Sequence, residues 1–160
     1  MGHPSIQCLR FFGNGNIIYE LIKSVSYPNN KAKHLSGLAK MLVSDFNGQV
    51  PSTMEELTRL PGVGRKTANV VLADSFGVPG LPVDTHVTRL SNLLGLTRSS
   101  DPVKIEAELC AGLPPERWGE FSHLLIVHGR TVCPANRPKC GECVLADLCR
   151  HAAKKTGKGA

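Results

Sequence analysis

Four cysteines near the C-terminal end of the chain have the density and spacing of a metal site. Cys133, Cys140, Cys143 and Cys149 follow the pattern C-x6-C-x2-C-x5-C, in a chain of 160 residues that holds six cysteines in all. Four thiolates can surround one zinc ion tetrahedrally or hold the corners of an iron–sulfur cube. Zinc sites more often pair two short C-x-x-C hairpins, and only one occurs here, so the spacing favours iron–sulfur over zinc. Buried structural cysteines or a disulfide pair are the third alternative.

The loop between the first two of these cysteines carries two cations. Arg137 and Lys139 lie in a stretch of six residues that also contains Pro134 and Pro138. Metal bonds at both ends and two prolines would hold the cations in place, so the loop could meet a DNA phosphate without losing much chain entropy. The alternative is that both are ordinary solvated charges.

A tight turn with two glycines precedes a lysine in the segment L-P-G-V-G-R-K-T-A-N, residues 60–69. A Walker A loop is excluded, because its pattern requires glycine where this chain has Leu60 and Arg65. Gly62 and Gly64 let the backbone turn sharply between two helices, and the N-terminus of the second helix favours an anion. The pattern predicts a helix-hairpin-helix that grips a DNA backbone without reading sequence. The alternative is that the glycines merely join two helices.

Two further residues have chemistry to offer. Lys66 lies in the first turn of the second hairpin helix, where the helix dipole disfavours a charged ammonium and favours the neutral, nucleophilic amine. The alternative is a charged lysine that binds phosphate. Asp84 begins the next predicted helix, in L-P-V-D-T-H, and capping that helix is its simplest role.

The elements that must position these residues are predicted to be helices, because apolar residues recur at helical spacing and no stretch alternates with period two. Ser52 is predicted to cap one of them, with Glu55 as its capping-box partner. The fold class is therefore predicted to be all-α. The predicted helices are residues 16–25, 31–46, 53–60, 65–75, 84–94, 102–110 and 116–129.

The charge is unevenly distributed along the chain. The net charge is +6 and the pI is about 9.2, and residues 130–160 hold seven basic and two acidic side chains. This surplus predicts a polyanionic partner, with a solvated basic tail as the alternative. No apolar run reaches the length of a membrane span and no signal peptide is recognised, so a soluble intracellular protein without a membrane partner is expected.

Taken together, these motifs resemble the endonuclease III family of DNA glycosylase/abasic lyases. The resemblance rests on L-P-G-V-G-R-K-T-A-N-V-V-L at 60–72, V-D-T-H-V-T-R-L at 83–90, H-G-R at 128–130 and the cysteine pattern, and it extends from about residue 17 to 149. It implies the helix-hairpin-helix glycosylase fold, in partial form, with a C-terminal [4Fe–4S] loop. The expected division is an irregular entry at 1–15, a helical domain at 16–130 with the hairpin at about 53–75, the cluster loop at 131–150, and a basic flexible tail at 151–160.

The resemblance also implies residue roles. Lys66 would attack C1′ of the damaged nucleotide and form a Schiff base that leads to β-elimination, while Asp84 would stabilise positive charge on the sugar. A carboxylate near the lysine would in turn favour the charged ammonium, opposing the dipole. The four cysteines would ligate a [4Fe–4S] cluster. The residues implied to contact DNA are Pro61, Gly62, Val63, Gly64, Arg65, Thr67, Arg137 and Lys139.

A lysine at position 66 implies lyase chemistry and oxidised pyrimidines as substrates, because the adenine-removing relatives carry serine there. The implied partner is double-stranded DNA with damaged pyrimidines or abasic sites, bound by a monomer. The implied location is the cytoplasm, at the nucleoid, if the source is bacterial or archaeal, and a nuclear or organellar location is the alternative. The family ordinarily has further helices before the point matched by Asn16, so exposed apolar surface and weakened base selection are expected. An impaired DNA-binding fragment of the family and a zinc-binding module are the alternative functions.

Overall fold

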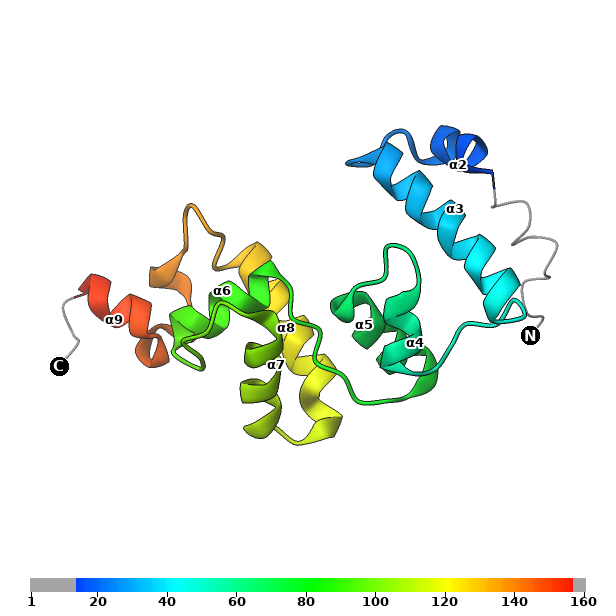
Figure 1. Ribbon diagram of the computed structural model, residues 1–160. Coiled ribbons are helices and arrows are strands. Elements are labelled where there is room, and N and C mark those ends of the chain that lie inside the picture. Colours follow the sequence, from blue (N-terminus) through cyan, green and yellow to red (C-terminus); the bar gives the residue numbers. More distant parts are fainter. Residues whose placement is uncertain (1–13, 157–160) are drawn as a thin grey trace. The chain divides into compact units, whose positions relative to one another are not determined.

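The computed structural model describes residues 14–156, and within that range it contains helices and no strands (Figure 1). The predicted all-α class is therefore confirmed. The predicted irregular entry falls mostly on residues 1–13, which lie outside the described range. The helices are α2 (Gly15–Ile22), α3 (Pro28–Asp45), α4 (Met54–Arg59), α5 (Arg65–Phe76), α6 (Thr85–Leu94), α7 (Pro102–Ala111), α8 (Trp118–Thr131) and α9 (Arg150–Thr156), with short 3-10 turns η1 (Pro115–Arg117), η2 (Cys140–Glu142) and η3 (Ala146–Leu148).

Local capping chemistry decides where several helices begin. Asp101 accepts a hydrogen bond from the amide of Val103 at 2.9 Å and caps α7, as its sequence predicts. The predicted cap of α4 is wrong by one residue. Thr53, not Ser52, accepts a bond from the amide of Glu56 at 3.3 Å. The Thr53 hydroxyl also donates to the Glu56 carboxylate at 2.9 Å, so Thr53 and Glu56 form the pair that the sequence assigns to Ser52 and Glu55.

The chain forms two compact units, divided between Ala68 and Asn69. In the first unit, α2 packs along α3. The middle of α3 lies close to the hairpin turn, since a Cβ added at Gly37 would lie 3.2 Å from Pro61. Glycine at this position lets the helix and the turn approach closely. The first unit therefore supports the hairpin from the side of α3.

The second unit is built around one apolar core from the segment before α6 and from α6, α7 and α8. The approach of α6 to α8 requires a glycine, because a Cβ at Gly129 would lie 2.9 Å from Nδ1 of His86 and 3.2 Å from Leu90. A buried bond from the hydroxyl of Ser122 to the carbonyl of Pro82, 2.6 Å long, ties α8 to the segment that leads into α6. The core residues are Leu81, Val83, Val87, Leu90, Ile105, Leu109 and Leu125.

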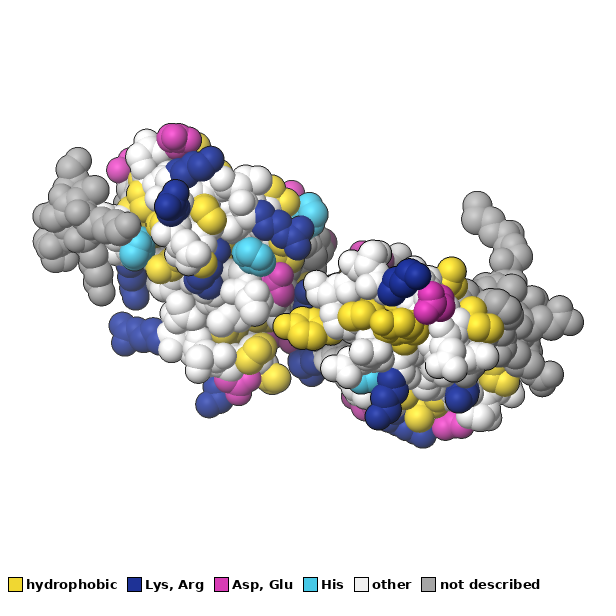
Figure 2. Space-filling view, turned by 90° about the horizontal axis from the view of Figure 1, so that it is seen from above, with side chains coloured by type: hydrophobic (Ala, Val, Ile, Leu, Met, Phe, Trp, Pro, Cys, Tyr) yellow, Lys and Arg dark blue, Asp and Glu magenta, His cyan; other side chains and the backbone are white. Residues whose placement is uncertain are grey.

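Apolar side chains lie at the surface of both units. Figure 2 shows hydrophobic side chains exposed among Lys and Arg side chains. In the second unit, Leu124 of α8, Val144 and Leu148 are 55%, 92% and 78% exposed and line one apolar groove.

Among the described residues, none of the helices is both long and apolar enough to cross a membrane. Residues 150–156 form α9, in a stretch for which the sequence predicts a flexible tail.

Candidate functional site

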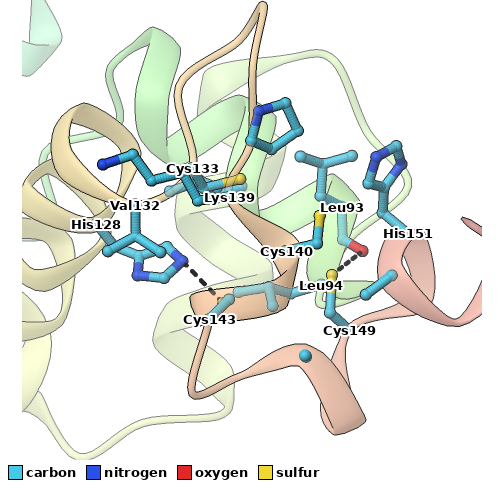
Figure 3. Close-up of a pocket in the computed structure, with 14 residues that line it drawn as sticks. Leu93, Leu94, His128, Val132, Cys133, Lys139, Cys140, Cys143, Cys149 and His151 are labelled. Atoms are coloured by element: carbon cyan, nitrogen blue, oxygen red, sulfur yellow. Dashed lines mark hydrogen bonds between the residues drawn. The ribbon is translucent and has the colours of Figure 1, made fainter.

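The four clustered cysteines converge on one cavity of the second unit. Cys133 follows α8, Cys140 begins η2, Cys143 follows it, and Cys149 precedes α9. All four line the same pocket (Figure 3). Each thiol is free and half-buried, so the disulfide alternative is not what the structure shows. The apolar part of the wall comes from Leu90, Leu93, Leu94, Val132, Ala146 and Ala152.

Polar groups reach three of the thiols. Arg89 of α6 donates to Sγ of Cys133 at 3.8 Å and to its backbone carbonyl at 2.8 Å. Nε2 of His128 lies 3.6 Å from Sγ of Cys143, and Figure 3 shows this contact between α8 and the loop that follows it. The Cys149 thiol donates to the carbonyl of Leu93 at 3.7 Å. The sulfurs are thus held by both α6 and α8.

The four thiols fit the donor set of an iron–sulfur cube. A cube takes each thiolate at a separate corner, and four thiols that line one cavity can supply those corners. The same four thiols are also a donor set for a single zinc ion.

The loop between Cys133 and Cys140 carries two accessible cations. Arg137 and Lys139 are exposed, and Lys139 also lines the cavity of the four cysteines. The loop is closed by a backbone bond from the Lys139 amide to the carbonyl of Val132, 3.0 Å long, just after α8. The loop therefore has a defined hydrogen-bonded base.

The glycine turn between α4 and α5 is a tight hairpin. The amide of Val63 donates to the carbonyl of Leu60 at 3.0 Å, and Gly62 has a φ of +78°. Its Cα faces α3 so closely that a Cβ there would lie 2.7 Å from Cβ of His34. Gly64 differs, since a Cβ there would meet no heavy atom within 4 Å. Gly62 is required by the fold, whereas Gly64 leaves open space before the N-terminus of α5.

Lys66 is exposed in the first turn of α5, where the sequence places it. The first amides of a helix have no acceptor within the helix, so this turn combines positive dipole with an accessible amine. Arg65 and Thr67 beside it are also exposed, and Ala68 and Asn69 are buried. The three side chains at 65–67 are thus accessible, while the next two positions hold the helix to the protein.

Asp84 has the capping role that its sequence position predicts. Its Oδ1 accepts a hydrogen bond from the amide of Val87 at 2.8 Å at the start of α6. This bond uses one of the two carboxylate oxygens and fixes the direction of the side chain. Lys66 belongs to the first unit and Asp84 to the second.

Sequence reasoning missed the role of Arg89. Its guanidinium binds the carbonyls of Gly129 and Cys133 at 3.4 and 2.8 Å, besides the Cys133 sulfur. The signal was present, because Arg89 belongs to the segment V-D-T-H-V-T-R-L at 83–90. The segment gives no local signal that Arg89 will contact Cys133, which lies 44 residues further along the chain.

Two family models match parts of the chain. The helix-hairpin-helix motif matches residues 45–73. The iron–sulfur binding domain of endonuclease III matches residues 137–149, which include three of the four cysteines. The expected [4Fe–4S] cofactor is thereby confirmed, together with the hairpin.

Curated relatives and solved structures match over most of the chain. Endonuclease III of Synechocystis sp. is 52% identical over 151 residues, covering 94% of this chain and 68% of the relative. Endonuclease III of Bacillus subtilis is 48% identical, covering 86% and 64%. A non-covalent endonuclease III–DNA complex superposes with a TM-score of 0.87 at 39% identity, covering 93% of this chain and 71% of that one. A trapped covalent endonuclease III–DNA intermediate matches with the same TM-score and identity. The chain thus spans about two thirds of the length of these curated relatives.

Proposed function

The chain belongs to the endonuclease III family, and from that premise we propose that it is a DNA N-glycosylase and abasic-site lyase of base-excision repair. The observation that carries the proposal is the accessible amine of Lys66, placed by a tight glycine turn at the positive end of α5. A nucleophile needs access to its substrate, and a phosphate-binding turn beside it would bring the sugar within reach.

Lys66 is the proposed nucleophile. Its amine attacks C1′ of the damaged nucleotide and the bond from C1′ to the base breaks, so the base leaves with a proton. The C1′–O4′ bond of the sugar ring then breaks as the nitrogen lone pair forms the imine, and O4′ takes up a proton. Loss of a proton from C2′ then drives β-elimination, which breaks the C3′–O bond and cuts the strand. The covalent imine is what makes this proton acidic enough to leave. Oxidised pyrimidines are the proposed substrates, because the chain has lysine at this position of the family pattern.

Asp84 is the proposed catalytic carboxylate. A negative charge near C1′ would stabilise the positive charge that develops on the sugar as the base departs. The bond from the Val87 amide to Oδ1 holds the side chain in one orientation without consuming the second oxygen. Capping and catalysis are therefore compatible roles for this residue.

The proposed DNA contacts come from two surfaces, the hairpin and the cluster loop. Pro61, Gly62, Val63, Gly64, Arg65 and Thr67 would meet the phosphate backbone through amides and short side chains, and Arg137 and Lys139 would add charge. Such contacts do not read sequence, which suits an enzyme that must search for damage throughout a genome. The target base must leave the stack to be reached.

Cys133, Cys140, Cys143 and Cys149 are the proposed ligands of the [4Fe–4S] cluster. Bound there, the cluster would cross-link α8, the loop and the residues before α9, and so hold the loop of Arg137 and Lys139 in one shape. The proposed division keeps the hairpin at about 53–75, the helical domain at 16–130 and the cluster loop at 131–150. The protein is proposed to act as a monomer in the cytoplasm, on double-stranded DNA containing damaged pyrimidines or abasic sites.

Borohydride trapping tests the proposal. Reduction of the imine on DNA containing one abasic site should give a covalent protein–DNA adduct with the wild-type protein and none with Lys66→Ala. Lys104 provides a matched control, since it is also an exposed lysine in the first turn of a helix, and Lys104→Ala should trap normally. An adduct that survives Lys66→Ala would refute the assignment.

The alternative function, DNA binding without catalysis, predicts a different pair of results. Binding would weaken steeply with salt, as expected for phosphate contacts, and no adduct or strand cleavage would appear with the wild-type protein. That outcome would refute the lyase proposal while leaving the hairpin assignment in place.

A further inference from the structure

A cluster bound by the four cysteines would place negative charge in their cavity, and thiolate ligands add to that charge. An iron–sulfur cube with four thiolate ligands carries net negative charge, and besides the cysteines the wall of this cavity is apolar except for His128, Lys139 and His151. Cys133 lies two residues after the end of α8, whose C-terminal end carries a partial negative charge of its own. Negative charge in such surroundings is costly unless hydrogen-bond donors face it.

His128, in the last turn of α8, is a hydrogen-bond donor that faces one of the cysteine sulfurs. Its Nε2 lies 3.6 Å from Sγ of Cys143, and both residues are half-buried. A thiolate has no proton to donate, so with Cys143 bound to iron the bond requires the proton on Nε2. The contact then becomes a hydrogen bond to a charged acceptor, the stronger class of such bonds.

The backbone of the same residue positions a second cysteine. The carbonyl of His128 accepts from the amide of Cys133 at 2.8 Å and from that of Val132 at 3.0 Å. His128 therefore contacts the first cysteine of the pattern through its main chain and the third through its ring. Arg89 differs, because its shorter contact is to the Cys133 carbonyl at 2.8 Å, while the sulfur is 3.8 Å away.

We propose that His128 is a positioning residue for the cluster, whose ring N–H binds the Cys143 thiolate and raises the cluster's reduction potential. The inference rests on the proposed ligand set, since it requires Cys143 to bind iron. Reduction adds negative charge to the cluster, so a donor on a ligand sulfur stabilises the reduced state more than the oxidised one. Removal of the donor should lower the potential.

The test compares three variants of the full chain purified with its cluster. His128→Leu removes the N–H, His128→Gln keeps an N–H at similar reach, and His123→Leu makes the same exchange at an exposed histidine of α8. Iron and acid-labile sulfide per chain and the reduction potential by voltammetry are measured for each. We expect a lower potential for His128→Leu, a return toward the wild-type value for His128→Gln, and no shift for His123→Leu.

Each outcome decides the question. An unchanged potential in loaded His128→Leu, or equal shifts in the Leu and Gln variants, would overturn the inference. If His128→Leu fails to retain iron, the iron content and the reduction potential of His128→Gln test the role of the N–H instead. Wild-type loading and potential in His128→Gln would support an N–H role, while loss of loading there too would show that only the shape of the ring matters. Failure of the wild-type protein to bind four irons would instead refute the ligand assignment, independently of His128.

Discussion

Replacing Gly62 by alanine tests whether the stability of the fold requires glycine in the hairpin turn. Replacing Gly64 by alanine tests whether DNA binding requires glycine there. Gly62 has a φ of +78°, in the left-handed region, and an added Cβ would lie 2.7 Å from Cβ of His34. The backbone conformation costs alanine about 1–2 kcal/mol. The clash involves the inner atom of the His34 side chain, so α3 itself must shift, at a cost of about 1–3 kcal/mol.

The expected loss follows from these contributions. Alanine also restricts the unfolded chain, which returns about 0.4–1 kcal/mol. The net destabilisation is therefore roughly 1–4.5 kcal/mol, or a decrease in Tm of about 2–18 °C for a chain of this length. Gly64→Ala is the matched control, because Gly64 lies outside the left-handed region and faces open space. Its stability should stay within about 0.5 kcal/mol of wild type.

Thermal unfolding followed by circular dichroism at 222 nm measures both variants, and DNA affinity is measured on the same samples. Gly64→Ala should bind abasic DNA more weakly, since its Cβ would occupy the space that a phosphate needs before α5. In the double variant His34→Ala/Gly62→Ala only part of the loss should be recovered, because alanine keeps the Cβ at 2.7 Å. Equal stability of Gly62→Ala and wild type would refute the reasoning from backbone geometry and the close contact.

Three further predictions follow from single hydrogen bonds. Asp84→Asn should keep the cap of α6 and the stability of wild type, whereas Asp84→Ala should lose about 1 kcal/mol in urea unfolding; both should lose base-release activity, and an active Asp84→Asn would refute the carboxylate role. Ser122→Ala should lower the free energy of unfolding by about 1–3 kcal/mol in the same assay, because the carbonyl of Pro82 loses its buried hydrogen-bond donor. An unchanged free energy of unfolding would contradict the assigned role of this bond. Thr53→Ala should cost about 1 kcal/mol by loss of the α4 cap, while Ser52→Ala should be neutral; the reverse order would contradict the observed cap.

Much of the local structure was predictable, because helix ends depend on residues only a few positions apart. Asp84 and Gly95 bound α6 as their types predict, with Gly95 at a φ of +82°. The one misplaced cap, Ser52 for Thr53, arose where two neighbouring hydroxyls each precede a glutamate by three residues. Pattern alone could not choose between them, since the choice depends on where the chain leaves the preceding segment.

The gathering of the four thiols around one cavity was predictable, but the side chains that surround them were not. Four closely spaced thiols can be recognised in the sequence because spacing along a short loop limits how far apart they can lie. The family resemblance supplied the roles of Lys66 and Asp84, which remain predictions that the trapping and substitution experiments test. Arg89 could not be assigned, because an arginine in a helix has no local signal that names its acceptor.

The residues by themselves thus determined the helices from α2 to α8, though not α9, together with the glycine turn and the clustering of thiols, all of which are short-range properties of the chain. Only the tertiary structure decided which donors meet the sulfurs. Arg89 contacts a cysteine 44 residues away and His128 one 15 residues away. These contacts form because Gly129 lets α8 pack closely on α6 and because the loop of the cysteines encloses one cavity together with both helices. Packing of this kind depends on the volume and direction of every side chain in the interface, and no local pattern encodes it.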